Sequence, residues 1–274
     1  MTEARRTVYF VSDRTGITAE TLGHSLLTQF TLDFEQRTIP FVDSEEKANQ
    51  VVEQIAAAGQ RSGLRPIVFS TVVDAHVRRV MQTTDAVLFD FFDTFIAPLE
   101  QELHMPSSHV IGRSHGVVDN NMYDVRIDAM NYALSHDDGA VTNHYSRADV
   151  ILTAVSRSGK TPTCIYLALQ YGIYAANYPL TQDDLTRGKL PRKLVEHKRK
   201  LYGLTINVDR LQKIRSGRLP NSDYASLRQC SYEVARAEAL FKGEGISFVN
   251  TTTMSIEEIA TKIIHEAKLE RRLY

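Results

Sequence analysis

The sequence predicts an α/β fold built from parallel, doubly wound sheets, with an N-terminal α/β unit and a C-terminal P-loop-like nucleotide-binding unit. The first observation is that short apolar runs recur along the chain, most of them followed by a helical pattern. The second is that these runs are continuously apolar, which is typical of strands covered on both faces. Alternation of such strands with helices favours parallel doubly wound sheets.

The first half of the chain contains four predicted strands. They cover residues 7–13, 37–43, 65–72 and 85–92. Helical patterns follow the first three strands, over residues 18–30, 44–59 and 74–82. Asp43 and Glu46 have the spacing of a capping box, which predicts where the second of these helices begins.

The second half contains four more predicted strands. They cover residues 149–155, 172–178, 203–207 and 245–250. Ser255 and Glu258 have capping-box spacing, and a helical apolar stripe follows them. Between the halves, the segment 104–121 breaks the pattern with a proline, several serines, two glycines and histidines. We therefore expect an N-terminal α/β unit over 1–105, a connecting segment over 106–147 and a P-loop-like kinase unit over 148–274.

The composition limits the class of protein. The 274 residues carry a formal net charge of -1 with a pI near 6.8, which argues against nucleic acid as the main partner. No apolar run approaches the ~20 residues that a membrane span needs, and the first apolar run ends at Asp13, unlike a signal peptide. Cys164 and Cys230 are predicted core residues in a reducing compartment. These observations predict a cytoplasmic protein that binds neither membrane nor nucleic acid.

The stretch AVSRSGKT has the form of a phosphate-binding loop between a strand and a helix. Gly159 allows the backbone to approach a phosphate, Lys160 can bridge phosphate oxygens and is a predicted catalytic residue, and the Thr161 hydroxyl can bind Mg²⁺. The helix that follows directs its free amides and positive dipole end at the anion. The predicted nucleotide-binding residues are Ala154, Val155, Ser156, Arg157, Ser158, Gly159, Lys160 and Thr161.

Ala154 departs from this pattern, because the first of the eight positions is usually glycine. Alanine restricts the backbone there but leaves the amide donors in place. The alternative interpretation is a chance Gly-Lys-Thr triplet at a strand–helix junction. The strand before the triplet and the helix after it favour nucleotide or phosphate binding.

Several segments resemble one known family. They are AVSRSGKTPT, HDDG at 136–139, ANYPL at 176–180, YASLRQC at 224–230, the opening VYFVSDRTGITAETLGHSLLTQF and the ending ERRLY. Together they resemble the bifunctional kinase/pyrophosphorylases that regulate phosphoenolpyruvate synthase and pyruvate,phosphate dikinase. The resemblance covers essentially the whole chain. The residues of YASLRQC and of the C-terminus are more similar to those of the synthase branch.

The resemblance implies two activities. The kinase phosphorylates a threonine of the target enzyme, with ADP as phosphoryl donor and AMP as product. The second activity removes that phosphate with inorganic phosphate and forms pyrophosphate. The expected protein substrate is phosphoenolpyruvate synthase, with pyruvate,phosphate dikinase as the alternative. Mg²⁺ is the expected metal, and a homodimer is compatible with the sequence.

Acidic residues and a histidine compete for the chemical role, because a threonine hydroxyl that attacks phosphorus benefits from a base. Asp137 and Asp138 precede a glycine and are the predicted catalytic carboxylates; alternatively they form a solvated turn. Asp90 ends a predicted strand and is more simply structural. Asp13 also ends a strand, in a position that often holds ligand, unless Thr18 caps the next helix. Histidine 115, within Ser114–Gly116, is a further candidate.

Two basic features remain open to two interpretations. The stretch RKLVEHKRKLYG at 192–203 is either a solvated helix face or a surface for an acidic partner or a nucleotide lid. Arg228 either reaches a phosphate or pairs with a helix carboxylate. Two other functions also remain open, namely a P-loop kinase of small molecules and a non-catalytic ADP sensor.

Overall fold

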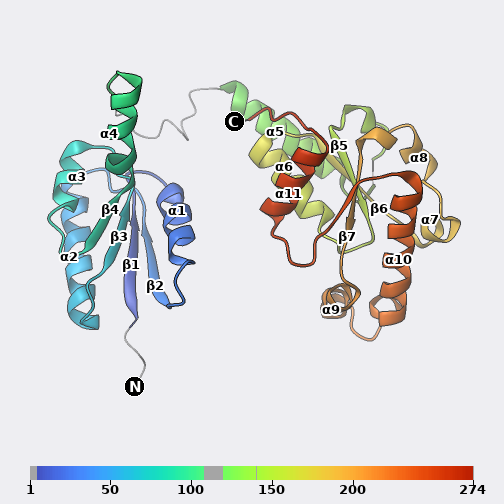
Figure 1. Cartoon of the computed structure of the whole chain (residues 1–274), viewed down its shortest axis with the longest axis horizontal. Helices are drawn as coiled ribbons and strands as arrows, with labels where there is room; N and C mark the ends of the chain where they lie inside the picture. Colours follow the sequence, from blue (N-terminus) through green and yellow to red (C-terminus); the bar gives the residue numbers. More distant parts are fainter. Residues whose placement is uncertain (1–4, 108–119, 140, 274) are drawn as a thin grey trace. The chain divides into compact units, whose positions relative to one another are not determined.

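The computed structural model describes residues 5–107, 120–139 and 141–273. The chain divides into two compact units, Met1–Val118 and Asp119–Tyr274, which we call the N-terminal and C-terminal units. Each unit contains one four-stranded sheet whose paired strands all run parallel (Figure 1). All eight predicted strands are present, and the predicted α/β fold with parallel doubly wound sheets is confirmed.

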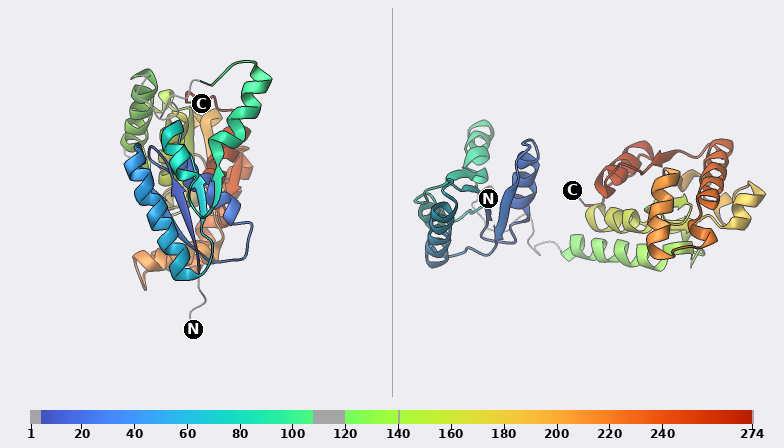
Figure 2. Two further views of the ribbon diagram at one scale, coloured as in Figure 1. Left: turned by 90° about the vertical axis from the view of Figure 1, so that its left-hand side faces the viewer. Right: turned by 90° about the horizontal axis from the view of Figure 1, so that it is seen from below.

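The N-terminal unit has the strand order β2-β1-β3-β4. Its strands are β1 (Arg6–Val11), β2 (Phe34–Ile39), β3 (Ile67–Ser70) and β4 (Val87–Asp90). Its helices are α1 (Ile17–Leu27), α2 (Glu45–Ser62), α3 (Ala75–Met81) and α4 (Phe91–Leu103). Helices α2 and α3 pack on one face of the sheet, and α1 and α4 pack on the other. Figure 2 shows the layers from two further directions.

Strand β1 shows why the apolar runs are continuous. Val8 and Phe10 belong to the core beneath α1 and α4, whereas Tyr9 and Val11 belong to the core beneath α2 and α3. All four side chains are at most 1% exposed. Because successive residues of a strand point to opposite faces, a strand buried on both faces needs apolar residues at every position.

The second strand lies earlier in the chain than predicted. β2 is an edge strand whose residues FEQRTI are largely exposed, so it lacks the apolar run that identifies the other strands. The predicted range 37–43 included Phe41 and Val42, which lie in the loop after the strand. The predicted cap of α2 is also wrong. The Ser44 hydroxyl accepts the Lys47 N–H at 3.3 Å, and Asp43 forms an ion pair with the Lys47 ammonium.

The C-terminal unit repeats the topology, with the order β6-β5-β7-β8. Its strands are β5 (Val150–Ala154), β6 (Ala175–Pro179), β7 (Leu201–Thr205) and β8 (Phe248–Asn250). One face is covered by α5 (Asn120–Ser135), α6 (Lys160–Tyr171) and α11 (Ile256–Glu266). The other is covered by α7 (Gln182–Arg187), α8 (Arg192–Val195), α9 (Val208–Arg218) and α10 (Leu227–Glu244). The predicted capping box of Ser255 and Glu258 is present at the start of α11.

The C-terminal unit begins earlier than the expected boundary at residue 148. Helix α5 falls within the predicted connecting segment, 106–147, yet it packs against α6 and β6. Ala129 and Ala133 of α5 are buried in the same core cluster as Cys164. The sequence did not reveal this packing because α5 has few apolar positions, and its buried residues are two alanines and Tyr132. Cys164 and Cys230 are both buried free thiols, as predicted.

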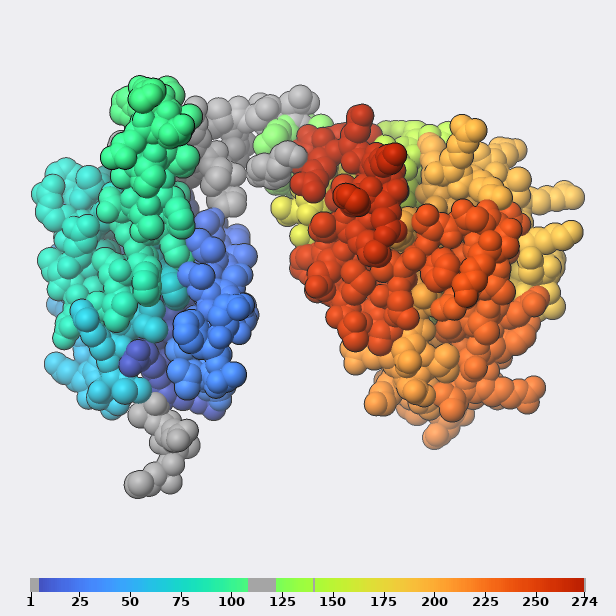
Figure 3. Space-filling model, viewed as in Figure 1, coloured from blue at the N-terminus to red at the C-terminus, as the bar shows by residue number. Residues whose placement is uncertain are grey.

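Helix α4 has an exposed apolar stripe. Phe95, Leu99 and Leu103 are spaced by four residues, and each is more than half exposed. The outer end of α4 stands clear of the other helices of the N-terminal unit (Figure 3). None of the helices that the structure describes combines the length and the apolar character that a membrane crossing requires.

Candidate functional site

The stretch from Ala154 to Thr161, which we call the GKT loop, leaves β5 and opens α6 at a switch in strand order. β6 lies on one side of β5 and β7 on the other, so the chain moves in opposite directions from this point. Ligands of open α/β sheets bind at the carboxyl ends of strands at such a switch. An open cleft of about 910 Å³ lies here. Its lining residues are Asp137, Asp138, Ser156, Arg157, Gly159, Lys160, Thr161, Pro162, Ile214, Arg218, Leu219 and Tyr224.

The departure at Ala154 is explained by its place in the strand. Ala154 is the last residue of β5, fully buried, and its carbonyl accepts the Leu180 N–H at 2.9 Å. The residues of the GKT loop with positive φ are Arg157, at 76°, and Gly159, at 90°. Glycine is therefore needed for its backbone freedom at 159 and not at 154. Arg157 holds a left-handed conformation that costs an L-residue about 1–2 kcal/mol.

The backbone of the loop offers donors to an anion. In the described part of the chain, the N–H groups of Ser156, Arg157 and Gly159 make no hydrogen bond. Gly159 precedes the first turn of α6, and no side chain caps that turn. The Ser158 hydroxyl is buried and donates to the Val155 carbonyl at 3.1 Å, which closes the turn from inside. Free amides at a helix N-terminus form a binding site for phosphate.

Lys160 is a buried cation at the base of the cleft. The side chain is 4% exposed, and its ammonium donates to the Val155 carbonyl at 3.1 Å. Burial lowers the pKa of Lys160 from 10.5 to about 8, against the opposing effect of the Asp138 and Asp137 carboxylates. A bound phosphate would supply the negative charge that favours the protonated form.

The acidic pair meets the GKT loop through Thr161. Asp137 and Asp138 lie in a single 3-10 turn, Asp137–Gly139, after α5. The Thr161 hydroxyl donates to the Asp137 carboxylate at 2.7 Å, and the Asn177 amide donates to the same oxygen. The Asn177 side-chain carbonyl accepts the Asp138 N–H at 3.0 Å. Both carboxylates line the cleft, but Asp137 is hydrogen-bonded and partly buried, whereas Asp138 is exposed.

Arg215 supports the GKT loop, and the sequence analysis did not identify it as a site residue. This α9 side chain is fully buried, and its guanidinium donates to the Ser156 carbonyl at 3.1 Å and the Tyr224 carbonyl at 3.0 Å. It pairs with Glu233 at 2.6 Å and stacks on the Tyr224 ring. The Tyr224 hydroxyl lies 3.0 Å from the Ser156 hydroxyl. These contacts fix the loop segment next to the strained Arg157.

Three other predicted candidates belong to the N-terminal unit. Asp13 lies in the N-terminal unit, where its buried carboxylate accepts the Val73 N–H at 2.8 Å and burial raises its pKa. Thr18 does not cap α1, since the residue before the helix is Gly16. Asp90 caps α4 and forms an ion pair with Arg78 at 3.3 Å, as the structural interpretation predicted. Histidine 115 and its neighbours 114 and 116 lie outside the described residues.

Neither Arg228 nor any residue of the basic stretch 192–203 is among the described residues that line the cleft. Lys198 pairs with Glu244 of α10 at 2.9 Å. The Lys200 ammonium donates to the Ser146 carbonyl at 2.7 Å, so it caps backbone groups. Arg228 is exposed on α10. The cations at the cleft are instead Arg157, Lys160 and Arg218.

Three side chains of the cleft could take part in holding Mg²⁺. Thr161, Asp137 and Asp138 bring one hydroxyl and two carboxylates together, and hard oxygen donors suit Mg²⁺. Among the described residues, no cluster of three or more metal-ligating side chains could hold an ion alone. Mg²⁺ commonly needs only one or two carboxylates when phosphates and waters complete its shell. A metal held here would therefore need phosphate or water oxygens in addition to these side chains.

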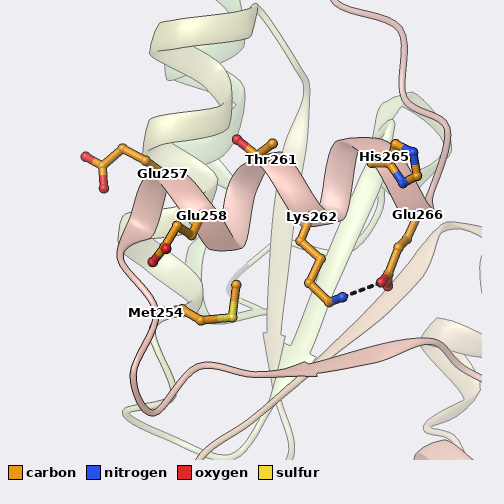
Figure 4. Close-up of a pocket in the computed structure, with 7 residues that line it drawn as sticks. All are labelled: Met254, Glu257, Glu258, Thr261, Lys262, His265 and Glu266. Carbon is orange, nitrogen blue, oxygen red and sulfur yellow. Dashed lines mark ion pairs between the residues drawn. The ribbon is translucent and has the colours of Figure 1, made fainter. Parts of the chain in front are cut away.

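A second hollow lies along α11 (Figure 4). Its volume is about 540 Å³, and its lining residues are Met254, Glu257, Glu258, Thr261, Lys262, His265 and Glu266. Lys262 forms an ion pair with Glu266 at 2.7 Å. The lining comes from one helix and the loop before it, and neither a buried cation nor a loop of free amides is among these residues. We therefore place the functional site at the GKT loop.

Comparison with known proteins agrees with the fold and the motifs. Residues 8–264 match the kinase/pyrophosphorylase family. A protein of Alkalilimnicola ehrlichii is 92% identical over the full length of both chains, and one of Halorhodospira halophila is 64% identical over the same span. One of Ectopseudomonas mendocina is 53% identical over 98% of this chain and 99% of its own. All three bear the name "putative phosphoenolpyruvate synthase regulatory protein". The chain therefore belongs to the kinase/pyrophosphorylase family.

Proposed function

We propose that the protein is a bifunctional cytoplasmic regulator of phosphoenolpyruvate synthase. It phosphorylates a threonine of the synthase with ADP, and it removes that phosphate with inorganic phosphate. The observation that carries this proposal is the cleft in which the free amides of the GKT loop, the buried Lys160 and the acidic pair meet. The family supplies the pair of reactions, and the relatives' names supply the target.

In the kinase direction, the loop amides and Lys160 hold the β-phosphate of ADP. Asp138 accepts the proton of the threonine hydroxyl as its oxygen attacks the β-phosphorus. The bond from that phosphorus to the bridging oxygen breaks, and AMP leaves. The Lys160 ammonium and the α6 N-terminus stabilise the negative charge of the transferred group. Thr161 and Asp137 would hold Mg²⁺, which supplies further charge neutralisation when bound.

In the second direction, inorganic phosphate takes the place of the β-phosphate in the loop. One of its oxygens attacks the phosphorus of the phosphothreonine, the bond to the threonine oxygen breaks, and pyrophosphate forms. The attacking phosphate gives up its proton, and Asp138 can pass this proton to the threonine oxygen as it leaves. The two reactions share the loop because its donors contact phosphate oxygens and need no contact with adenosine.

One assay separates this proposal from three alternatives. The protein is incubated with ADP and purified phosphoenolpyruvate synthase, pyruvate,phosphate dikinase or a mixture of small hydroxyl acceptors. We expect phosphothreonine on the synthase together with AMP. Phosphothreonine on the dikinase alone would change the target, and a phosphorylated small molecule would indicate a metabolite kinase. ADP binding without turnover of any acceptor would indicate a sensor.

The site assignment is tested with matched variants. Lys160→Met should abolish both phosphorylation and pyrophosphate formation, whereas Lys198→Met, a lysine outside the cleft, should leave both unchanged. Asp138→Asn should lower kcat by 10²- to 10⁴-fold, roughly the contribution of a general base, with little change in ADP affinity. A folded Lys160→Met variant with full activity in either direction would refute the assignment.

A further inference from the structure

Asn177 of β6 forms hydrogen bonds to the turn Asp137–Gly139, which carries the acidic pair. Its side chain is fully buried at the middle of β6, directly beside β5. The side-chain amide donates to the Asp137 carboxylate, and the side-chain carbonyl accepts the Asp138 N–H at 3.0 Å. Its backbone N–H donates to the His136 carbonyl at 3.1 Å. One strand residue thus contacts three successive residues, His136 to Asp138, at the start of the turn.

These contacts fix an unfavourable backbone. Asp138 has φ of 50° and Gly139 has φ of 68°, so two successive residues are left-handed. A left-handed L-residue costs about 1–2 kcal/mol, so the turn needs partners that hold it. A Cβ at 139 would lie 3.1 Å from the Tyr178 ring, which leaves little room for the turn to move towards β6. The hydrogen bonds of Asn177 are therefore positioned to select this conformation.

The same contacts leave the two carboxylates in different states of hydrogen bonding. Asp137 accepts one hydrogen bond from Asn177 and one from Thr161, so its oxygen is committed within the protein. Asp138 lies at the cleft surface, and only its backbone is held by Asn177. The bond to Asp137 sets the orientation of Thr161, and the bond to the Asp138 N–H sets the direction of the free carboxylate.

We propose that Asn177 is a positioning residue for phosphoryl transfer, acting through Asp137 and Asp138. The inference rests on the proposed function, since it names a residue that prepares that same site. Asn177 is absent from the residues that line the cleft, so it is not expected to contact ADP. Its loss should therefore lower kcat and leave the KM for ADP nearly unchanged.

The test uses two variants of the full-length protein. Asn177→Asp keeps the shape and the acceptor for the Asp138 N–H, but it replaces the donor to Asp137 with a second carboxylate. Asn177→Ala removes both bonds. We expect each variant to lose about 10- to 100-fold in kcat, as is typical when a supporting partner of a site residue is removed. The KM for ADP should change less than about twofold, since uniform binding is retained. Ile263→Val, a buried change in α11, serves as the control for lost stability.

A double-mutant cycle separates positioning from general support of the fold. If Asn177 acts through Asp137 and Asp138, adding Asn177→Ala to a protein that already carries Asp137→Asn and Asp138→Asn should cause little further loss of kcat, because both carboxylates that it positions are already gone. Losses that multiply would overturn the inference, as would wild-type kcat in Asn177→Asp. Unfolding of the C-terminal unit in both Asn177 variants would also overturn it, since the residue would then hold the fold. A wild-type protein that makes no phosphothreonine would instead refute the proposed function.

Discussion

Replacing the buried Lys160 with methionine should stabilise the C-terminal unit while it abolishes phosphoryl transfer. Methionine has a similar length and fills the same space without a charge. The Lys160 side chain is 4% exposed, and burial is the largest influence on its pKa. The protein therefore carries a cation in a place that disfavours it. This cost is expected at a group whose charge is needed only when phosphate is bound.

The magnitude follows from the shift of the pKa. A fall from 10.5 to about 8 corresponds to about 3 kcal/mol at 1.36 kcal/mol per pKa unit. Loss of the hydrogen bond from Lys160 to the Val155 carbonyl offsets about 1 kcal/mol of this. Lys160→Met should then raise the free energy of unfolding at pH 7 by about 2 kcal/mol. That is a large change for a domain of ordinary stability.

The sign of the pH dependence follows from proton binding. Below pH 8, Lys160 is protonated in both the folded and the unfolded chain, so the full burial cost is present. Between pH 8 and 10.5 the folded state releases its proton while the unfolded state keeps it, so stability rises with pH. Lys160→Met lacks this rise. The advantage of the variant over the wild type should therefore shrink as pH rises from 7 to 9.5.

The assay is urea unfolding of both proteins at pH 7 and 9.5, followed by tyrosine fluorescence. The chain has no tryptophan, and all of its twelve tyrosines except Tyr9 lie in the C-terminal unit, so the signal reports that unit. Lys198→Met, a change of a more exposed lysine, is the matched control and should unfold like the wild type. A Lys160→Met variant that unfolds at lower urea than the wild type at pH 7 would refute the reasoning.

Four further predictions follow from the same structure. ADP affinity should be constant below pH 8 and weaken by up to about tenfold per pH unit above it, because Lys160 then loses its charge; calorimetry at pH 7 and 9.5 measures this. ADP at 100 times its Kd should add about 2.7 kcal/mol to the stability of the C-terminal unit, and an unchanged melting temperature would contradict nucleotide binding. Gly203→Ala should destabilise that unit by about 1–3 kcal/mol, because its Cβ would lie 2.8 Å from the side chains of Phe241 and Phe248, and unchanged urea unfolding would contradict this. Arg215→Lys should raise the KM for ADP with kcat less affected, since one ammonium cannot replace the forked contacts behind the loop; an unchanged KM would count against this role.

Local sequence signals identified the strands and the GKT loop because the relevant physics is local. A strand buried on both faces is apolar over most of its length, as in Val8–Val11 of β1 and Val150–Leu152 of β5. A glycine, a lysine and a hydroxyl between a strand and a helix need only their neighbours to form the loop. Edge strand β2 failed the same test, because most of its side chains face solvent.

The partners of the loop depend on contacts between distant segments. Asn177 reaches Asp137 only because β6 pairs with β5. The sequence of a single strand does not determine which strands lie beside it. Arg215 lies in a polar helix with the composition of a solvated surface, yet it is fully buried behind Ser156. The segment ANYPL at 176–180, one of those that carry the family resemblance, contains Asn177, but the segment did not reveal the contacts of this residue.

The most direct measurement of the central claim follows the β-phosphate of ADP. ADP radiolabelled in that phosphate is incubated with the protein and purified phosphoenolpyruvate synthase, and the label is traced by phosphopeptide mapping while AMP is measured. We predict one labelled phosphothreonine on the synthase for each AMP released, with no label transferred by Lys160→Met. Label that stays in ADP, or that enters a small molecule in place of the synthase, would contradict the claim.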